Sequence, residues 1–345
     1  MSAACVGLLG ALSAPLDAAP EGPCGALSAE IAGGFSRAWP ETGVNERFVL
    51  PRAQVQAALG QGPVGLRAGL AAVRSGGEGG YIGVAGEAIV PEVQIAEARW
   101  APHPQVAVGA GLLEDPWRAA AQAAWGLPAV AAPMVERAGL SPVSDLGMGA
   151  VLSSPGGRVE GGLHLSSGEG ARLRERNDGQ DVAALLQVSP LGEERLSIEL
   201  YGRDGSTGLG SVRDHRAGGR VAFTAAPVTA YGEVERAWGL GGDALAEPIA
   251  ASAGGVVALK QGPQAWGRLD WLRARPADPE SDRYEFFLGG GYAQGPALVG
   301  LSYSGQRNDP AASLIAGAEA LASAHQLTLF LSAELGAPPR PSEAP

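Results

Sequence analysis

Hydrophobic and polar residues alternate along most of this chain with a period of two. Between 195 and 203, apolar residues occupy the even positions and charged or polar residues the odd positions. Segments 158–166, 228–235 and 326–335 repeat this alternation. Because successive side chains of a β-strand point to opposite faces, the pattern predicts strands with one apolar and one polar face.

The alternating segments, separated by Gly- and Pro-rich breaks, predict about sixteen strands. They are 27–38, 48–59, 63–74, 91–100, 105–113, 143–153, 157–167, 180–189, 194–203, 211–224, 227–238, 250–260, 264–275, 283–292, 296–306 and 322–335. Strands of about ten residues can span the apolar band of an outer membrane when they tilt, whereas soluble strands average about 5–6 residues.

The links between these segments also alternate in length. Links after even-numbered strands are short, and most links after odd-numbered strands are longer, with 114–142 the longest and with 204–210 and 276–282 as short exceptions. Short turns at one rim and long loops at the other are typical of outer-membrane barrels. The sequence therefore predicts an all-β fold: a transmembrane antiparallel β-barrel over residues 21–335, with short periplasmic turns and long extracellular loops.

Composition excludes two other classes of protein. The chain has 345 residues, is 46% hydrophobic and has a mean hydropathy of +0.05. Beyond residue 20, no apolar run approaches the ~20 residues that a membrane helix needs. The formal charge of −11 argues against a nucleic-acid partner, because a surface that binds a polyanion must be basic.

The two ends of the chain differ from its middle. An apolar run at 3–16 followed by Asp-Ala-Ala-Pro resembles a secretory signal, so we expect residues 1–20 to be removed on export. No basic residue precedes that run, which leaves open a truncated start. Residues 336–345 are Pro-rich, and we expect a disordered tail. Removal of Cys5 with the signal would leave one thiol, so no disulfide framework or Cys-based metal site is expected.

Three stretches resemble the phosphate-selective porins of the O and P type. Glu-Ile-Ala-Gly-Gly-Phe-Ser at 30–36 and Phe-Val-Leu-Pro-Arg-Ala-Gln-Val at 48–55 are similar to that family's opening hairpin. Ser-Asp-Leu-Gly-Met-Gly-Ala-Val-Leu at 144–152, followed by Gly-Gly-Leu-His, resembles the strands after its third loop. The family's Gly-Gln-Phe and Pro-Phe are replaced by 109–113 and by Pro116-Trp117, and its lysine ladder is missing, since Lys260 is the only lysine.

The resemblance implies an outer-membrane channel for passive diffusion of small hydrophilic solutes or ions, without phosphate selectivity. It implies outer-membrane lipid as a partner and, because porins of this size often form trimers, a homotrimer. It also implies that the third loop folds into the lumen, where irregular backbone can line water. The loop would then supply charges to a constriction: Glu114, Asp115, Arg118, Glu136 and Arg137. An extracellular cap over the mouth is the alternative for this loop.

The polar faces of the predicted strands carry charges of both signs. The pore-lining candidates are Arg52, Arg67, Glu97, Arg99, Arg158, Glu160, Arg195, Glu199, Arg203, Arg220, Glu233, Glu235, Arg268, Asp270 and Glu285. Rings of fixed charge set the ion preference of pores, and mixed signs predict cross-strand pairing with weak selectivity. The alternative is that these charges only pair with one another in a polar interior.

The chain offers no clear catalytic constellation. Its four histidines lie far apart and lack metal-ligand spacing, and no Gly-x-Ser-x-Gly motif occurs. We therefore expect neither an enzyme nor a cofactor or metal site. Two other functions stay open: a closed outer-membrane barrel with a structural or adhesion role, and a secreted soluble β-protein that binds carbohydrate.

Overall fold

A computed structural model describes residues 24–40, 45–75, 88–168, 179–191, 195–206, 212–260, 262–277, 281–308 and 323–335. The predicted signal segment 1–20 and the tail 336–345 lie outside these residues. No helix among the described residues is long and apolar enough to cross a membrane.

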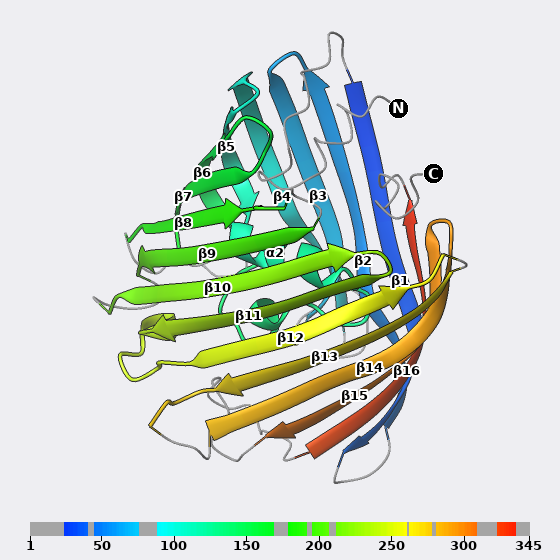
Figure 1. Cartoon of the computed structure of the whole chain (residues 1–345). Helices are drawn as coiled ribbons and strands as arrows, with labels where there is room; N and C mark the ends of the chain where they lie inside the picture. The colour runs from blue at the N-terminus through cyan, green and yellow to red at the C-terminus, as the bar shows by residue number, and fades with distance from the viewer. Residues whose placement is uncertain are drawn as a thin grey trace.

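The described residues form sixteen antiparallel strands that close into a barrel, as the alternation predicts (Figure 1). The strands are β1 (Cys24–Pro40), β2 (Asn45–Gln61), β3 (Val64–Ser75), β4 (Ala88–His103), β5 (Val106–Glu114), β6 (Ser144–Ser153), β7 (Val159–Ser166), β8 (Asp181–Val188), β9 (Leu196–Gly205), β10 (Asp214–Ala225), β11 (Val228–Trp238), β12 (Ile249–Ala258), β13 (Pro263–Arg273), β14 (Asp282–Gln294), β15 (Ala297–Asn308) and β16 (Ser323–Leu335). The barrel closes where β1 pairs with β16, for example Gly34 opposite Phe330. Closure leaves no unpaired strand edge.

The links follow the predicted alternation of length. The turn between β2 and β3 spans only Gly62 and Pro63, whereas the link between β5 and β6 covers 115–143 and contains α2 (Pro116–Trp125) and α3 (Met134–Arg137). A short 3-10 turn, η2 (Leu240–Gly242), lies between β11 and β12. The first loop is shorter than predicted, because pairing between β1 and β2 continues as far as Ala38 and Asn45.

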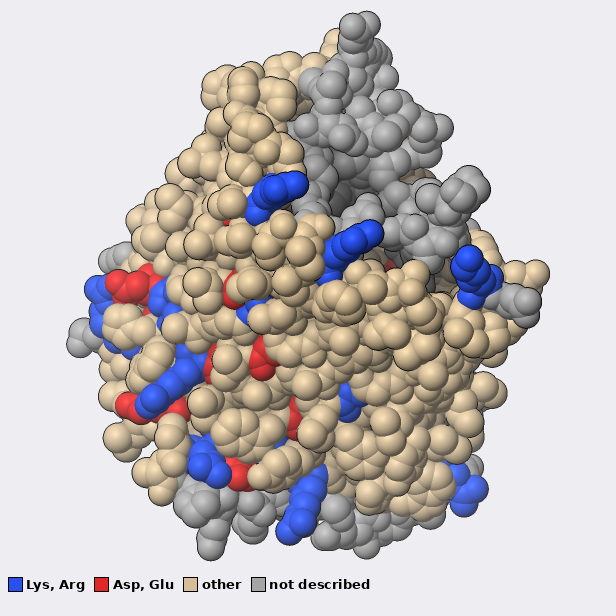
Figure 2. Space-filling model, in the orientation of Figure 1, with Lys and Arg blue, Asp and Glu red and all other residues tan. Residues whose placement is uncertain are grey.

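The two faces of the strands separate as the alternation predicts. On β9, Leu200 is 57% exposed and Ile198 39% exposed on the outside, while Glu199 and Arg203 are buried on the inside. Large exposed hydrophobic residues occur on the outer face around the barrel, among them Leu27, Leu66, Leu146, Leu163, Val234, Leu269, Leu301 and Leu329. Figure 2 shows an outer face that is mostly uncharged, with a mixed group of acidic and basic residues at one end of the strands and further basic residues elsewhere along its margin. The outer surface is therefore apolar and the inner one charged.

One glycine in the barrel wall has a conformation that side chains rarely adopt. Gly111 in β5 has φ of +125°, and a Cβ there would lie 2.1 Å from the Ala96 carbonyl oxygen of β4. Gly161 in β7 has open space around its Cβ position.

We expect Gly111→Ala to lower the free energy of unfolding by about 1–3 kcal/mol, because the backbone must either stay strained or move away from β4. Gly161→Ala is the control, with an expected change of about 0.5 kcal/mol or less. Urea unfolding of both variants, refolded into lipid vesicles, measures the difference. Equal stability of the two variants would contradict the assigned backbone conformation.

Candidate pore and its inner loop

The inner loop, residues 115–143, begins with a well-capped helix. The carboxylate of Asp115 accepts a hydrogen bond of 2.8 Å from the Arg118 backbone N–H, and Pro116 occupies the first turn. The alanine-rich interior favours helix, and Gly126 ends it with φ of 70°. Burial raises the pKa of the Asp115 carboxyl above its usual value, although the hydrogen bond from Arg118 opposes this shift. The sequence therefore encodes α2 locally, with Asp115 as its N-cap.

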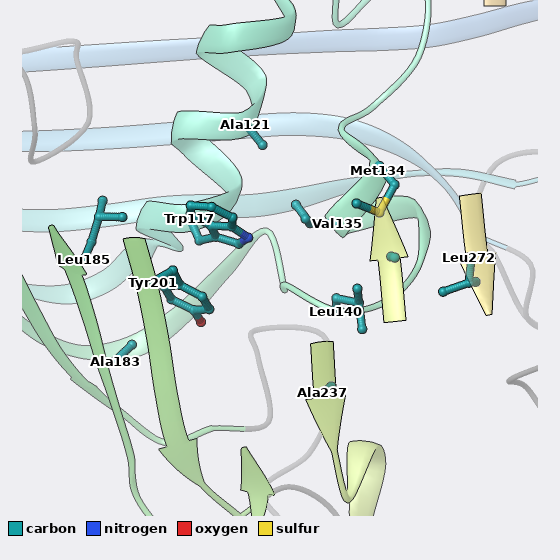
Figure 3. Packing of buried hydrophobic residues seen from close by; sticks show 11 residues of the cluster. Trp117, Ala121, Met134, Val135, Leu140, Ala183, Leu185, Tyr201, Ala237 and Leu272 are labelled. Atoms are coloured by element: carbon teal, nitrogen blue, oxygen red, sulfur yellow. The ribbon is translucent and has the colours of Figure 1, made fainter. Parts of the chain in front are cut away.

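Helix α2 lies inside the barrel, against the inner face of the wall (Figure 1). The indole of Trp117 stacks on the ring of Tyr201 from β9, with centroids 5.2 Å apart and an interplanar angle of 7°. Its Nε1 donates a 2.9 Å hydrogen bond to Glu235 of β11. Figure 3 shows Trp117, Ala121, Met134 and other loop residues packed on side chains of the surrounding strands. The loop 115–143 thus lies inside the barrel, where the family resemblance implies it.

The second half of the loop reaches the far side of the lumen. Trp125 packs edge-on against Tyr231 and donates a hydrogen bond of 3.0 Å to the Ala131 carbonyl. With it, Leu127 and Ala129 form an apolar cluster whose wall members are Ala32, Tyr231, Trp266, Leu298 and Phe330. The second half of the loop therefore shares an apolar cluster with residues of β1, β11, β13, β15 and β16.

The loop charges pair within the barrel and do not form an open ring of charge. Arg118 binds Glu114 at 2.7 Å and Glu136 at 2.9 Å, so three of the five candidates form one ion-pair cluster. Arg137 donates from Nε to Glu285 of β14 at 3.0 Å and lies over the ring of Phe287. Asp115 and Arg118 are buried, and Arg137 is the most exposed of the five charges.

The wall charges also pair, mostly across adjacent strands. Eleven of the fifteen candidates are buried: Arg67, Glu97, Arg99, Glu199, Arg203, Arg220, Glu233, Glu235, Arg268, Asp270 and Glu285. Glu160 on β7 is half-buried and accepts a hydrogen bond from Ser153. Arg158 and Arg195 are exposed in turns outside β7 and β9, and the side chain of Arg52 lies outside the described residues. Arg158 and Arg195 lie outside the wall because β7 begins at Val159 and β9 at Leu196, one residue later than each arginine.

Sequence reasoning missed the aromatic residues that hold the loop. Tyr201, Tyr231 and Phe330 share the inward face with charged or polar residues, so the alternation places them correctly but does not assign them a role. Trp117, Trp125 and Trp266 are buried inside the barrel. Period-two reasoning identifies the face of a residue, whereas contact with a distant loop becomes visible only in three dimensions.

The inner face of β2–β7 carries a different set of side chains. Arg67 of β3 lies 3.2 Å from Glu97 of β4 and 3.6 Å from Glu114, at the base of the loop. Arg99 of β4 is a third buried charge on this wall. Half-buried polar residues accompany these charges: Gln54, Gln56 and Glu160. Among the described residues, no group of three or more His, Cys, Asp or Glu side chains could hold a metal ion.

Comparisons with known proteins bear on the fold alone. No protein-family model and no curated protein sequence matches this chain. The anion-selective porin from Comamonas acidovorans has a similar structure, with a TM-score of 0.67 and 10% identity over 91% of this chain and 100% of that chain. The outer-membrane channel DcaP of Acinetobacter baumannii (TM-score 0.64, 9% identity, 92% and 99% covered) is also similar. So is a trimer form of OmpT, an outer-membrane protein of Vibrio cholerae (TM-score 0.58, 8% identity, 91% and 99% covered). The chain thus has the sixteen-stranded fold of these outer-membrane proteins.

Proposed function

We propose that this chain is an outer-membrane porin, a water-filled channel that small hydrophilic solutes or ions cross by passive diffusion. One observation carries the proposal: a closed barrel has an apolar outer face and a charged inner face, with a loop folded against part of that inner face. A barrel without strand edges satisfies its backbone hydrogen bonds in hydrocarbon, and an apolar outer face suits lipid. Outer-membrane lipid is then its principal partner.

The passage would run along the inner face of β2–β7. The loop packs on β8–β16 and β1, through contacts that include Leu185, Tyr201, Glu235, Arg268, Glu285, Leu298, Phe330 and Ala32. On the other side, the paired charges Arg67, Glu97 and Arg99 would act on passing ions through their field. Because the pairs mix both signs, we propose weak charge selectivity.

We also propose that the chain is related to the phosphate-selective porins and that it forms a homotrimer. The three stretches that resemble phosphate-selective porins of the O and P type fall on β1, β2 and the β6–β7 hairpin, which supports kinship with that group. Phosphate selectivity does not follow, since the chain has a single lysine. The trimer form of a protein with this fold supports a homotrimer.

The second candidate is a closed barrel with a structural or adhesion role. The dense packing of the loop favours it, because Trp117, Trp125 and Arg220 are completely buried within the barrel. Single-channel recording in a planar bilayer separates the two candidates, since a closed barrel gives no current steps. Membrane fractionation with heat-dependent gel mobility tests the remaining candidate, because a soluble carbohydrate-binding protein would stay in the aqueous fraction.

We expect Glu97→Gln to shift the channel toward anions. Glutamine keeps the size of the side chain but removes the carboxylate 3.2 Å from Arg67, so the positive potential of Arg67 and Arg99 increases locally. The reversal potential across a salt gradient measures the permeability ratio. Asp204→Asn is the control, since Asp204 is exposed on the outer face. An equal shift in both variants, or none in Glu97→Gln, would argue against a passage beside β3 and β4.

A further inference from the structure

Two wall arginines, Arg220 on β10 and Arg268 on β13, contact the inner loop in the same way. The Arg220 guanidinium carbon lies 4.0 Å from the ring centre of Trp117, and that of Arg268 lies 4.9 Å from the ring centre of Trp125. Each arginine also donates a hydrogen bond to a loop carbonyl, at 3.1 Å to Trp117 and at 2.9 Å to Ala132. Each arginine therefore holds both a loop side chain and the loop backbone.

Carboxylates of the wall orient both guanidiniums. Arg220 donates to Glu199 at 2.5 Å and to Glu233 at 2.9 Å, and both residues lie directly opposite it on the neighbouring strands. Arg268 donates to Asp270 from Nη2 at 2.8 Å and from Nε at 3.1 Å. Both arginine side chains are 0% exposed. A permeating ion cannot touch them, and the adjacent carboxylates offset their charge.

We propose that Arg220 and Arg268 are positioning residues that clamp the inner loop to the wall and thereby fix the width of the passage. Their effect on the width of a channel rests on the proposed function, whereas the clamp itself does not. A planar guanidinium can stack on an indole while its in-plane N–H groups bind carboxylates and a carbonyl. Lysine carries the same charge but lacks this geometry, so Arg→Lys separates the positioning effect from the charge.

The direct test is amide hydrogen exchange of residues 116–137 in the full-length barrel, reconstituted in lipid vesicles. In Arg220→Lys and Arg268→Lys, we expect this exchange to become faster by on the order of tenfold, because the stacking and one or more charged hydrogen bonds are lost. Arg203→Lys is the matched control. Arg203 is also buried on the wall, but its hydrogen bonds go to Asp181 and to the Gly168 carbonyl, outside the loop. In Arg203→Lys, amide hydrogen exchange of the inner loop should stay at the wild-type rate.

Channel recording provides a second readout. Both lysine variants should show noisier current and a larger mean conductance, with the wild-type reversal potential, because the charge is kept. Trp117→Leu removes the ring above Arg220 and leaves every charge in place, so it should also give faster loop exchange and a larger, noisier current. It replaces a lysine variant that does not assemble.

Loop exchange at the wild-type rate in both Arg220→Lys and Trp117→Leu would overturn the clamp, as would an equal increase in Arg203→Lys. A wild-type barrel that carries no current contradicts the proposed function instead. Loop exchange still decides the clamp in that case.

Discussion

Leu200→Arg is expected to lower the free energy of unfolding in lipid vesicles by about 2–4 kcal/mol. Leu200 lies midway along β9 and is 57% exposed on the apolar outer face. An arginine at the bilayer midplane loses hydration or draws water into the hydrocarbon, and measured costs for barrels fall in this range. Urea unfolding in vesicles measures the change, and the heat-modifiable folded band reports assembly.

His215→Arg is the matched control for this substitution. His215 also faces outward and is exposed, but it lies at the loop-side end of β10 beside Asp204, which it contacts at 3.0 Å. The cost of arginine falls to about 0–1 kcal/mol near the membrane interface. If Leu200→Arg and His215→Arg were equally stable in vesicles, the outer face of β9 would not contact hydrocarbon.

Asp181→Ala is expected to cost about 3–5 kcal/mol of unfolding free energy. The carboxylate of Asp181 is buried on the inner face of β8, where it accepts a hydrogen bond of 2.5 Å from Arg203 Nε and one of 2.8 Å from the Ser206 backbone N–H. Its removal leaves the buried guanidinium of Arg203 without its carboxylate partner, and burying an uncompensated charge is the main cost.

The control is an ion pair of similar composition on the exposed surface. Asp204 pairs with Arg213 across the link between β9 and β10, and both side chains are more than half exposed. Water solvates either partner when the other is removed, so Asp204→Ala should cost about 0–1 kcal/mol. Denaturant unfolding of the two variants under one salt condition compares them directly. Similar losses in both would mean that water reaches Arg203 inside the barrel.

Cross-strand pairing shows where local reasoning stops. A two-residue turn at Ala226-Pro227 joins β10 to β11, and it places Arg220 directly opposite Glu233. Sequence patterns placed this turn one residue earlier, at 225–226. Moving a turn by one residue changes the register by two, so the predicted turn kept the inward faces of both strands but gave Arg220 a different partner. The second partner, Glu199, depends on a longer loop whose length does not specify the register.

The sequence by itself determined the sixteen strands, their inward and outward faces and the alternation of short and long links, because these follow from neighbouring residues and the period of a strand. The alanine run also favours α2 locally, and the structure adds Asp115 as its cap. Only the tertiary structure decided that the loop packs on β8–β16 and β1, and that Arg220 and Arg268 hold its tryptophans. The hydrogen bonds from the two arginines join residues 103 and 136 positions apart, and closure of the barrel brings these residues together.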